Sequence, residues 1–407
     1  MEMQWVLLCG AVRAEHDADA PDFTLPLATL PGVTFLAAGR SAHPDPNRSD
    51  RHPFIIAAAP GFLLAGFAVA PFDGLYFAEN PTTPNSSWCV TSDLVSRARS
   101  RPPPSTSPTA SASSPTSSRT SMIYMRCILT IQSVGLVPDI GGGYTIAKLQ
   151  VHKGGDRATL VTFDSVHRVW FEEDVGSPLP AHERDRERNW VPHSVVVLGN
   201  TLWWFDLSWG SFSCDINVAD PDLRFHRLPL GRALLEANQF VFSKRCVTVS
   251  QGTLQYVKII DGAGIEVAAV HMWTLVFDKI DWEWAWQENY AVRFNEIWNS
   301  RSYTDTGLPQ SIPLLAAVSP SDPNMVYFYF TLMQRVVGVN VQERRVVHFS
   351  ACNVVVNNAA LVTEAVGLYV LPWHLPPAVA DSGVNVGGWA DIMITKGLGS
   401  RNHPLQL

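Results

Sequence analysis

Charged residues are scarce in this sequence, and positive charge is not in excess. Only 16% of its 407 residues are Asp, Glu, Lys or Arg, whereas about a quarter is usual for soluble domains. The 30 basic residues are outnumbered by 37 acidic ones, so the chain lacks the positive charge with which nucleic-acid-binding domains attract phosphates. With 46% hydrophobic residues the chain can bury a large core, which excludes a protein disordered throughout.

The motifs that identify common enzymes and metal sites are also missing. The sequence contains no G-x-S-x-G nucleophile elbow, no H-E-x-x-H zinc motif, no P-loop and no dinucleotide-binding fingerprint. No two of the 12 histidines lie within four residues of each other, so the sequence offers no local chelate. We therefore expect no enzymatic activity, no catalytic residues, no cofactor, no metal and no nucleic-acid partner.

Closely spaced cysteines and an uninterrupted apolar run of spanning length are lacking too. The six cysteines form no C-x-x-C pair, and no basic, apolar leader begins the sequence, so we expect reduced cysteines and a cytoplasmic or nuclear protein. Residues 53–72 carry no charge, but Pro60-Gly61, Gly66 and Pro71 interrupt them. Two buried strands joined by a turn are favoured there over a membrane helix, and we expect no membrane contact.

The sequence does contain the alternation of apolar and polar residues that is typical of β-strands, and it has 14 Trp and 29 Pro. Residues 193–205 read as strand, Gly-Asn turn and strand, and residues 246–259 repeat this pattern with a Gln-Gly turn at an offset of 52 positions. Further hairpins are predicted over 270–286, 314–331 and 336–349. The sequence thus predicts an all-β, propeller-like array of antiparallel hairpins with few short helices.

One segment breaks this pattern and divides the expected domain. Residues 101–121 consist mostly of Ser, Pro and Thr, which cannot bury enough apolar surface to offset the entropy of ordering. We expect a single propeller-like domain over residues 1–355, interrupted by a disordered loop at 97–122. Residues 356–407 are expected to hold one or more C-terminal strands and an irregular tail.

The densest group of aromatic and acidic residues lies in the first of the repeated hairpins. Trp203 and Trp209 could form a platform on which a sugar ring or a peptide side chain stacks, with Asp206 and Asp215 as hydrogen-bond acceptors. The alternative is that alternate residues pack between blades while the two aspartates accept N–H groups of turns. The same choice applies to Trp282, Trp284 and Trp286, which share one face of a strand.

Several of these segments together resemble a known family. They are residues 190–215, 223–229, 245–254, 272–275, 294–308 (with the sequence YTDTGL) and 326–328, joined by residues 5–8 and 142–149 nearer the start. The chain resembles the DUF1618 domain-of-unknown-function family, which is greatly expanded in grasses. That family is similar to the propeller-like domains that follow F-boxes in plant ubiquitin-ligase receptors. No F-box-like helical segment precedes Trp5, so the resemblance does not imply a ligase role.

The resemblance brings no established activity, cofactor or catalytic residue, and three functions stay open. The first is a non-enzymatic module that binds another protein through its loops. The second is a carbohydrate-binding or carbohydrate-active protein that uses surface tryptophans. The third is a truncated or decayed family copy without activity, because residues 76–130 depart from the family pattern.

Overall fold

The computed structural model describes most of the strand-rich body of the chain. The described residues are 4–14, 23–38, 54–60, 62–67, 88–91, 123–125, 133–139, 142–152, 156–179, 188, 190–218, 220–235, 241–261, 267–279, 283–352, 370–375 and 391–396. The expected disordered loop at 97–122 lies outside them, as does Trp282.

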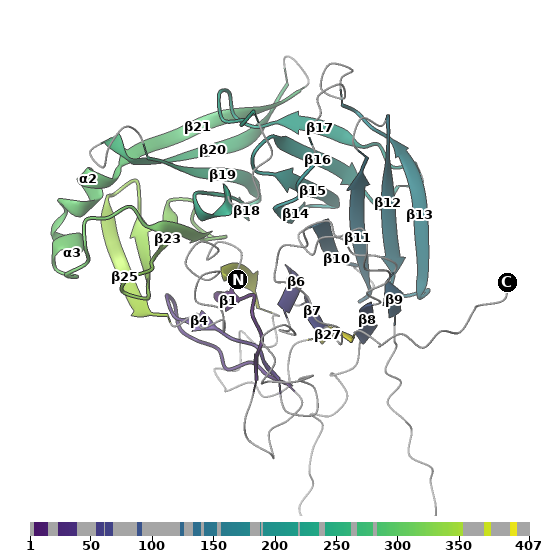
Figure 1. Ribbon diagram of the computed structural model, residues 1–407, viewed down its shortest axis with the longest axis horizontal. Helices are drawn as coiled ribbons and strands as arrows, with labels where there is room; N and C mark the ends of the chain where they lie inside the picture. Colours follow the sequence, from purple (N-terminus) through teal and green to yellow (C-terminus); the bar gives the residue numbers. More distant parts are fainter. Residues whose placement is uncertain are drawn as a thin grey trace, which may run out of the picture.

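Four antiparallel sheets of four sequential strands each form consecutive blades of a β-propeller (Figure 1). From the innermost strand outward, the first two blades are β10 (Val134–Pro138), β11 (Tyr144–Val151), β12 (Arg157–Asp164), β13 (Val169–Gly176) and then β14 (Ser194–Leu198), β15 (Thr201–Asp206), β16 (Gly210–Asp215), β17 (Arg224–Arg227). The next two are β18 (Arg245–Ser250), β19 (Thr253–Ile260), β20 (Ala269–Asp278), β21 (Glu283–Arg293) and then β22 (Leu314–Val318), β23 (Met325–Phe330), β24 (Arg335–Asn340), β25 (Arg345–Ala351). The expected all-β propeller-like fold is confirmed.

Two of the remaining sheets combine strands from both ends of the chain, and the third, β2-β5-β3, holds N-terminal strands alone. One has the order β6-β7-β27-β8-β9, another β26-β1-β4 and a third β2-β5-β3. Their strands are β1 (Trp5–Cys9), β2 (Arg13–Ala14), β3 (Phe23–Thr24), β4 (Val33–Thr34), β5 (Ala37–Ala38), β6 (Phe54–Ala59), β7 (Phe62–Phe67), β8 (Trp88–Thr91), β9 (Ile123–Met125), β26 (Val370–His374) and β27 (Asp391–Lys396).

The innermost strands of six sheets contact one another in a closed ring. Their order is β6, β10, β14, β18, β22, β26 and back to β6. The ring is closed by pairing between the two ends of the chain, because β26 pairs antiparallel with β1 from Trp5↔His374 to Cys9↔Val370. In addition, β27 pairs parallel with β7. The C-terminal strands expected within 356–407 therefore belong to sheets with N-terminal strands, and the propeller extends beyond residue 355.

Helices contribute little to the described structure. Its α-helices are α2 (Phe294–Trp298) and α3 (Arg301–Thr304), and a 3-10 turn, η3 (Val241–Ser243), precedes β18. The side chain of Ser300 caps α3 by accepting the N–H of Tyr303. In the described residues, no helix has the length and apolar character that crossing a bilayer requires.

The hairpin turns follow directly from the sequence. Gln251 and Gly252 both have positive φ (49° and 71°), the backbone of a type I′ turn whose twist matches that of the flanking strands. Gln251 bears a side chain in this rarely adopted conformation, and two hydrogen bonds hold it there. Its N–H donates to Pro320 O (2.9 Å) and its Nε2 donates to Ser321 O (2.9 Å). The turn between β18 and β19 is thereby fastened to the next blade.

Adjacent blades pack through large side chains on alternating strand positions. Between the blades that begin with β10 and β14, Leu149, Leu160, Trp204 and Phe212 share one buried cluster. Trp204 is fully buried, and its Nε1 donates to Ser133 O across the blade boundary (2.9 Å). Trp204 therefore acts as a packing residue with its one polar atom satisfied.

Gly135 on β10 is a point of close approach between these two blades. A Cβ at this position would lie 2.5 Å from Leu202 Cδ2 and 2.9 Å from Val195 Cγ1. We expect Gly135→Ala to destabilise the protein by about 1–3 kcal/mol through overpacking, as measured by urea unfolding. Gly176→Ala is the matched control, because a Cβ there meets nothing within 4 Å. Equal unfolding midpoints for the two variants would contradict this packing.

Candidate functional site

Three of the four residues predicted to bind a ligand are buried. Trp203 and Asp206 lie on β15, and Trp209 lies in the turn that follows; their exposed fractions are 2%, 0% and 6%. Trp203 is covered by Phe205 and His226, with ring centroids 6.4 and 4.6 Å away. The structure thus excludes an exposed stacking platform made of Trp203 and Trp209, because neighbouring side chains already cover these rings. They are packing residues, the alternative that the sequence had left open.

Asp215, the fourth residue, ends β16 and is half-buried. Its Oδ1 accepts the N–H of Asn217 (3.0 Å), so the carboxylate stabilises the turn after the strand. It does not join the contacts of Asp206. The four predicted residues therefore do not form one site.

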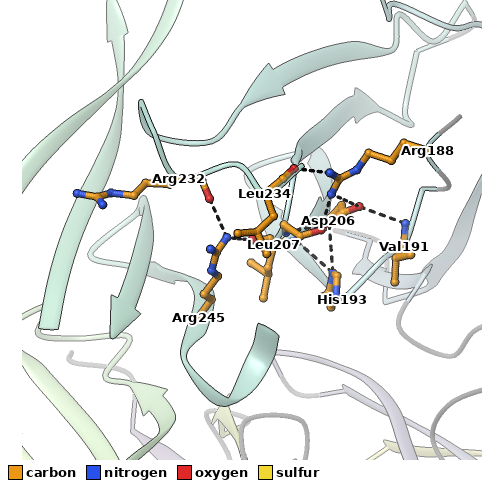
Figure 2. A network of polar contacts seen from close by, with 9 residues as sticks. Arg188, Val191, His193, Asp206, Leu207, Arg232, Leu234 and Arg245 are labelled. Atoms are coloured by element: carbon orange, nitrogen blue, oxygen red, sulfur yellow. Dashed lines mark hydrogen bonds and ion pairs between the residues drawn. The ribbon is translucent and has the colours of Figure 1, made fainter. Parts of the chain in front are cut away.

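Asp206 is the centre of a buried polar network (Figure 2). Its Oδ1 accepts the N–H of Ser208 (2.8 Å) and the Ser208 hydroxyl (2.5 Å), while Oδ2 accepts the N–H of Val191 (3.3 Å). The guanidinium of Arg188, itself almost fully buried, lies 3.8 Å from Oδ2. Arg188 also donates to Ser208 Oγ (2.6 Å) and to Leu234 O (2.5 Å). The carboxylate thus fixes a β-turn and neutralises a buried arginine.

His193 borders the same network and contacts it through Nδ1. Its Nδ1 accepts the N–H of Leu207 (3.1 Å) and lies 3.6 Å from Asp206 Oδ1. A nitrogen that accepts a backbone hydrogen bond carries no proton, so the proton of a neutral ring is on Nε2. His193 and Asp206 together hold residues 206–208 in place.

Arg245 lies at the first position of β18, next to this network. It is 4% exposed, and its Nη1 donates to Leu207 O (2.7 Å) and Arg232 O (2.9 Å), as Figure 2 shows. The Tyr256 phenol lies beside it, and burial raises the pKa of Tyr256 to about 12, so this neighbour is neutral. In the part of the chain that the structure describes, no carboxylate forms an ion pair with Arg245.

Arg245 also lines a cavity of about 590 Å³ along the axis of the propeller. The six innermost strands supply its walls, which are mostly aliphatic, with Ile55, Val134, Val195, Val247 and Ala316 among them. Ligand cavities typically measure about 300–1,000 Å³ and combine apolar walls with a few fixed polar groups. The cavity therefore has the size and lining of a small-molecule site.

A second surface feature lies at the end of the β20–β21 hairpin. Phe277 and Trp284 are directly opposite each other in the register and are 40% and 37% exposed. Their ring centroids are 5.3 Å apart in an edge-to-face arrangement, and Trp284 also contacts the buried Trp203 (5.9 Å). We call Phe277 and Trp284 the aromatic tip. It is anchored on the core yet open to a partner.

Sequence signals for the cavity and the aromatic tip are weak. A charged residue at the start of an apolar strand, as in Arg245-Cys246-Val247, is unremarkable without knowledge of the cavity that it faces. Trp284 was grouped with Trp282 and Trp286 by spacing alone, yet Trp286 is half-buried and donates its Nε1 to Arg227 O (2.8 Å). Among the described residues, no group of three or more His, Cys, Asp or Glu side chains is placed to hold a metal ion.

The chain is similar to one family model and to several solved structures. Residues 204–327 match the model of a family described as a protein of unknown function (DUF1618). No curated protein matches the chain. Sqt1 of Saccharomyces cerevisiae is 11% identical over 54% of this chain, with a TM-score of 0.26, and the aligned part spans 50% of Sqt1. Apo AztD from Citrobacter koseri is 10% identical over 70% of this chain and 67% of its own, with a TM-score of 0.27.

The matched segment runs from β15 to β23 and includes Asp206, Arg245 and the aromatic tip. These residues occupy two neighbouring blades of the ring, β14–β17 and β18–β21. The sequence-based resemblance and the family model thus coincide on this part of the chain. Residues 204–327 of this β-propeller match the model of the DUF1618 family, whose function is unknown.

Proposed function

We propose that this protein is a non-enzymatic interaction module that binds another protein through the aromatic tip. The observation that carries the proposal is the exposure of Phe277 and Trp284 beside each other on a hairpin whose Trp284 contacts the buried Trp203. Trp and Phe are enriched at protein interfaces, and residues anchored on a packed core lose little entropy when a partner binds. Exposed clusters of this kind are typical of interaction sites.

The surroundings of the tip support the proposal. Val276, which precedes Phe277, is 36% exposed and presents apolar surface on the opposite face of the same hairpin. Trp286 fastens the hairpin to Arg227, and two strongly exposed leucines, Leu230 (100%) and Leu235 (95%), belong to the segment that follows this anchor. An isolated exposed leucine needs no explanation, but several apolar residues in connected segments are consistent with a surface that a partner covers.

The test is site-specific photo-crosslinking with p-benzoylphenylalanine in place of Phe277. The matched control has the same group in place of Phe171, which is 53% exposed on the outer strand β13. We expect a discrete protein adduct from position 277 in cell extract and none from position 171. Trp284→Ala should reduce the yield of this adduct by about tenfold or more, because interface tryptophans commonly contribute 2 kcal/mol or more.

Two outcomes would count against the proposal. The same set of adducts from positions 277 and 171 would show that the tip is no more than ordinary surface. Binding of an oligosaccharide on a glycan array that disappears in Trp284→Ala would instead favour the carbohydrate-binding alternative, for which Trp284 is the exposed tryptophan in the described part of the chain.

A further inference from the structure

The geometry points to a second site: we propose that the central cavity binds a small monocarboxylate, with the anionic head on Arg245 and an apolar body along the strand walls. This inference does not depend on the aromatic tip. It rests on the charge of the groups at one end of the cavity, on the register of β18 with β19, and on the lining of the cavity.

The first observation is a buried cation, Arg245, that forms no ion pair with a carboxylate among the described residues. Buried charges in proteins are normally paired, because transfer of an ion out of water is costly. Arg245 is 4% exposed, and the groups that it bonds, the carbonyls of Leu207 and Arg232, are neutral. The nearby carboxylate, Asp206, is held by Ser208 and Arg188. The charge of Arg245 is therefore left for a ligand to balance.

The second observation is that further positive charge surrounds Arg245. Lys258 on β19 is its directly opposite partner in the register, and like charges at such positions destabilise a sheet. Arg232 follows on the segment between β17 and β18, where its guanidinium lies over the Trp273 ring (5.0 Å). Burial lowers the pKa of Lys258 to about 8, and the charges of Arg245 and Arg232 contribute, while Asp261 opposes them. This repulsion is what a bound anion would relieve.

The third observation is the lining beyond Arg245. The planar guanidinium suits a carboxylate, which it can bind through two parallel hydrogen bonds. The walls contributed by β6, β10, β14 and β18 carry mostly Ile, Val, Ala and Leu side chains, so a ligand bound there would need an apolar body. A volume of about 590 Å³ accommodates a medium-length alkyl or aryl chain attached to the head group.

Isothermal titration of the full chain with straight-chain monocarboxylates from hexanoate to dodecanoate tests the proposal. We expect saturable one-to-one binding by at least one of them, with the matching alcohol bound about tenfold or more weakly, since charge-assisted hydrogen bonds contribute about 1.5–3 kcal/mol. Inorganic phosphate alone should bind far more weakly than the best carboxylate. Equal binding of acid and alcohol, or of phosphate and acid, would overturn the proposal, as would no binding of any chain length.

Variants separate a binding role from a structural one. Arg245→Met should weaken the best carboxylate about tenfold or more, whereas Arg224→Met, which removes an exposed arginine paired with Asp222, should leave it unchanged. If Arg245→Met does not fold, Lys258→Met carries the test. It should raise the melting temperature of the ligand-free protein, because it removes repulsion, and lower the affinity for the carboxylate. If Arg245 served only to bind the two carbonyls, Lys258→Met would leave the affinity for the carboxylate unchanged. That result would contradict the proposal.

Discussion

Asp206→Ala is expected to destabilise the protein by about 3–5 kcal/mol, a large fraction of the stability of a typical domain. The variant would remove the carboxylate that lies 3.8 Å from the buried guanidinium of Arg188. It would also leave the N–H and hydroxyl of Ser208 and the N–H of Val191 without their acceptor in the interior. Urea unfolding followed by tryptophan fluorescence measures the loss, because Trp203, Trp204 and Trp209 surround the network.

Asp222→Ala is the matched control for this variant. Asp222 forms an exposed ion pair with Arg224, and such pairs contribute about 0–1 kcal/mol. The double variant Asp206→Ala/Arg188→Met should be less destabilised than the sum of its single changes, because removal of both partners leaves no unpaired charge. Equal losses for Asp206→Ala and Asp222→Ala would show that the network does not contribute as described.

A chain that ends at residue 355 is expected to lose cooperative folding altogether. It would lack β27, which pairs with β7, and β26, which pairs with β1 and lies between β22 and β6 in the inner ring. The loss includes Trp373, which is 1% exposed and donates its Nε1 to Ala59 O (2.8 Å). Removal of one such tryptophan side chain typically costs about 3–5 kcal/mol, and the whole strand contributes more. The unpaired edge of β1 would in addition favour aggregation.

Size-exclusion chromatography and thermal unfolding test this prediction. The truncated chain should elute as aggregate and show no cooperative transition. A chain that ends at residue 396 keeps β26 and β27 and should unfold like the full chain. A folded, monomeric chain of 355 residues would show that the C-terminal strands are dispensable. The milder Trp373→Ala variant then reports the contribution of the strand within an otherwise intact ring.

The hairpins were predictable because each is determined by a short stretch of sequence. Apolar and polar residues alternate on either side of Gly199-Asn200 and Gln251-Gly252. This pattern predicts hairpins at the positions where the structure has β14–β15 and β18–β19. The two strands expected within the uncharged run at 53–72 are β6 and β7. In each case the strand partners are joined by a short turn, so register follows from the turn.

Features that depend on distant pairing could not be predicted in this way. Nothing in the residues around Trp373 indicates that β1 is their partner, because the two strands are separated by the whole ring. The burial of Trp209 depends on Trp190, Phe225 and Arg188, which come from different segments. The role of Arg245 becomes visible only when the six inner strands enclose a cavity around it.

The closure of the ring by β26 also has a consequence for biosynthesis. Because Trp5 pairs with His374, β1 leaves the ribosome long before its antiparallel partner β26 is synthesised. Contacts between such distant positions slow folding, and partly synthesised blades expose open edges in the meantime. The four blades built from sequential strands can form as they emerge, whereas the ring itself is completed only after synthesis has passed β26. Folding of this protein should therefore depend on protection of its nascent chain.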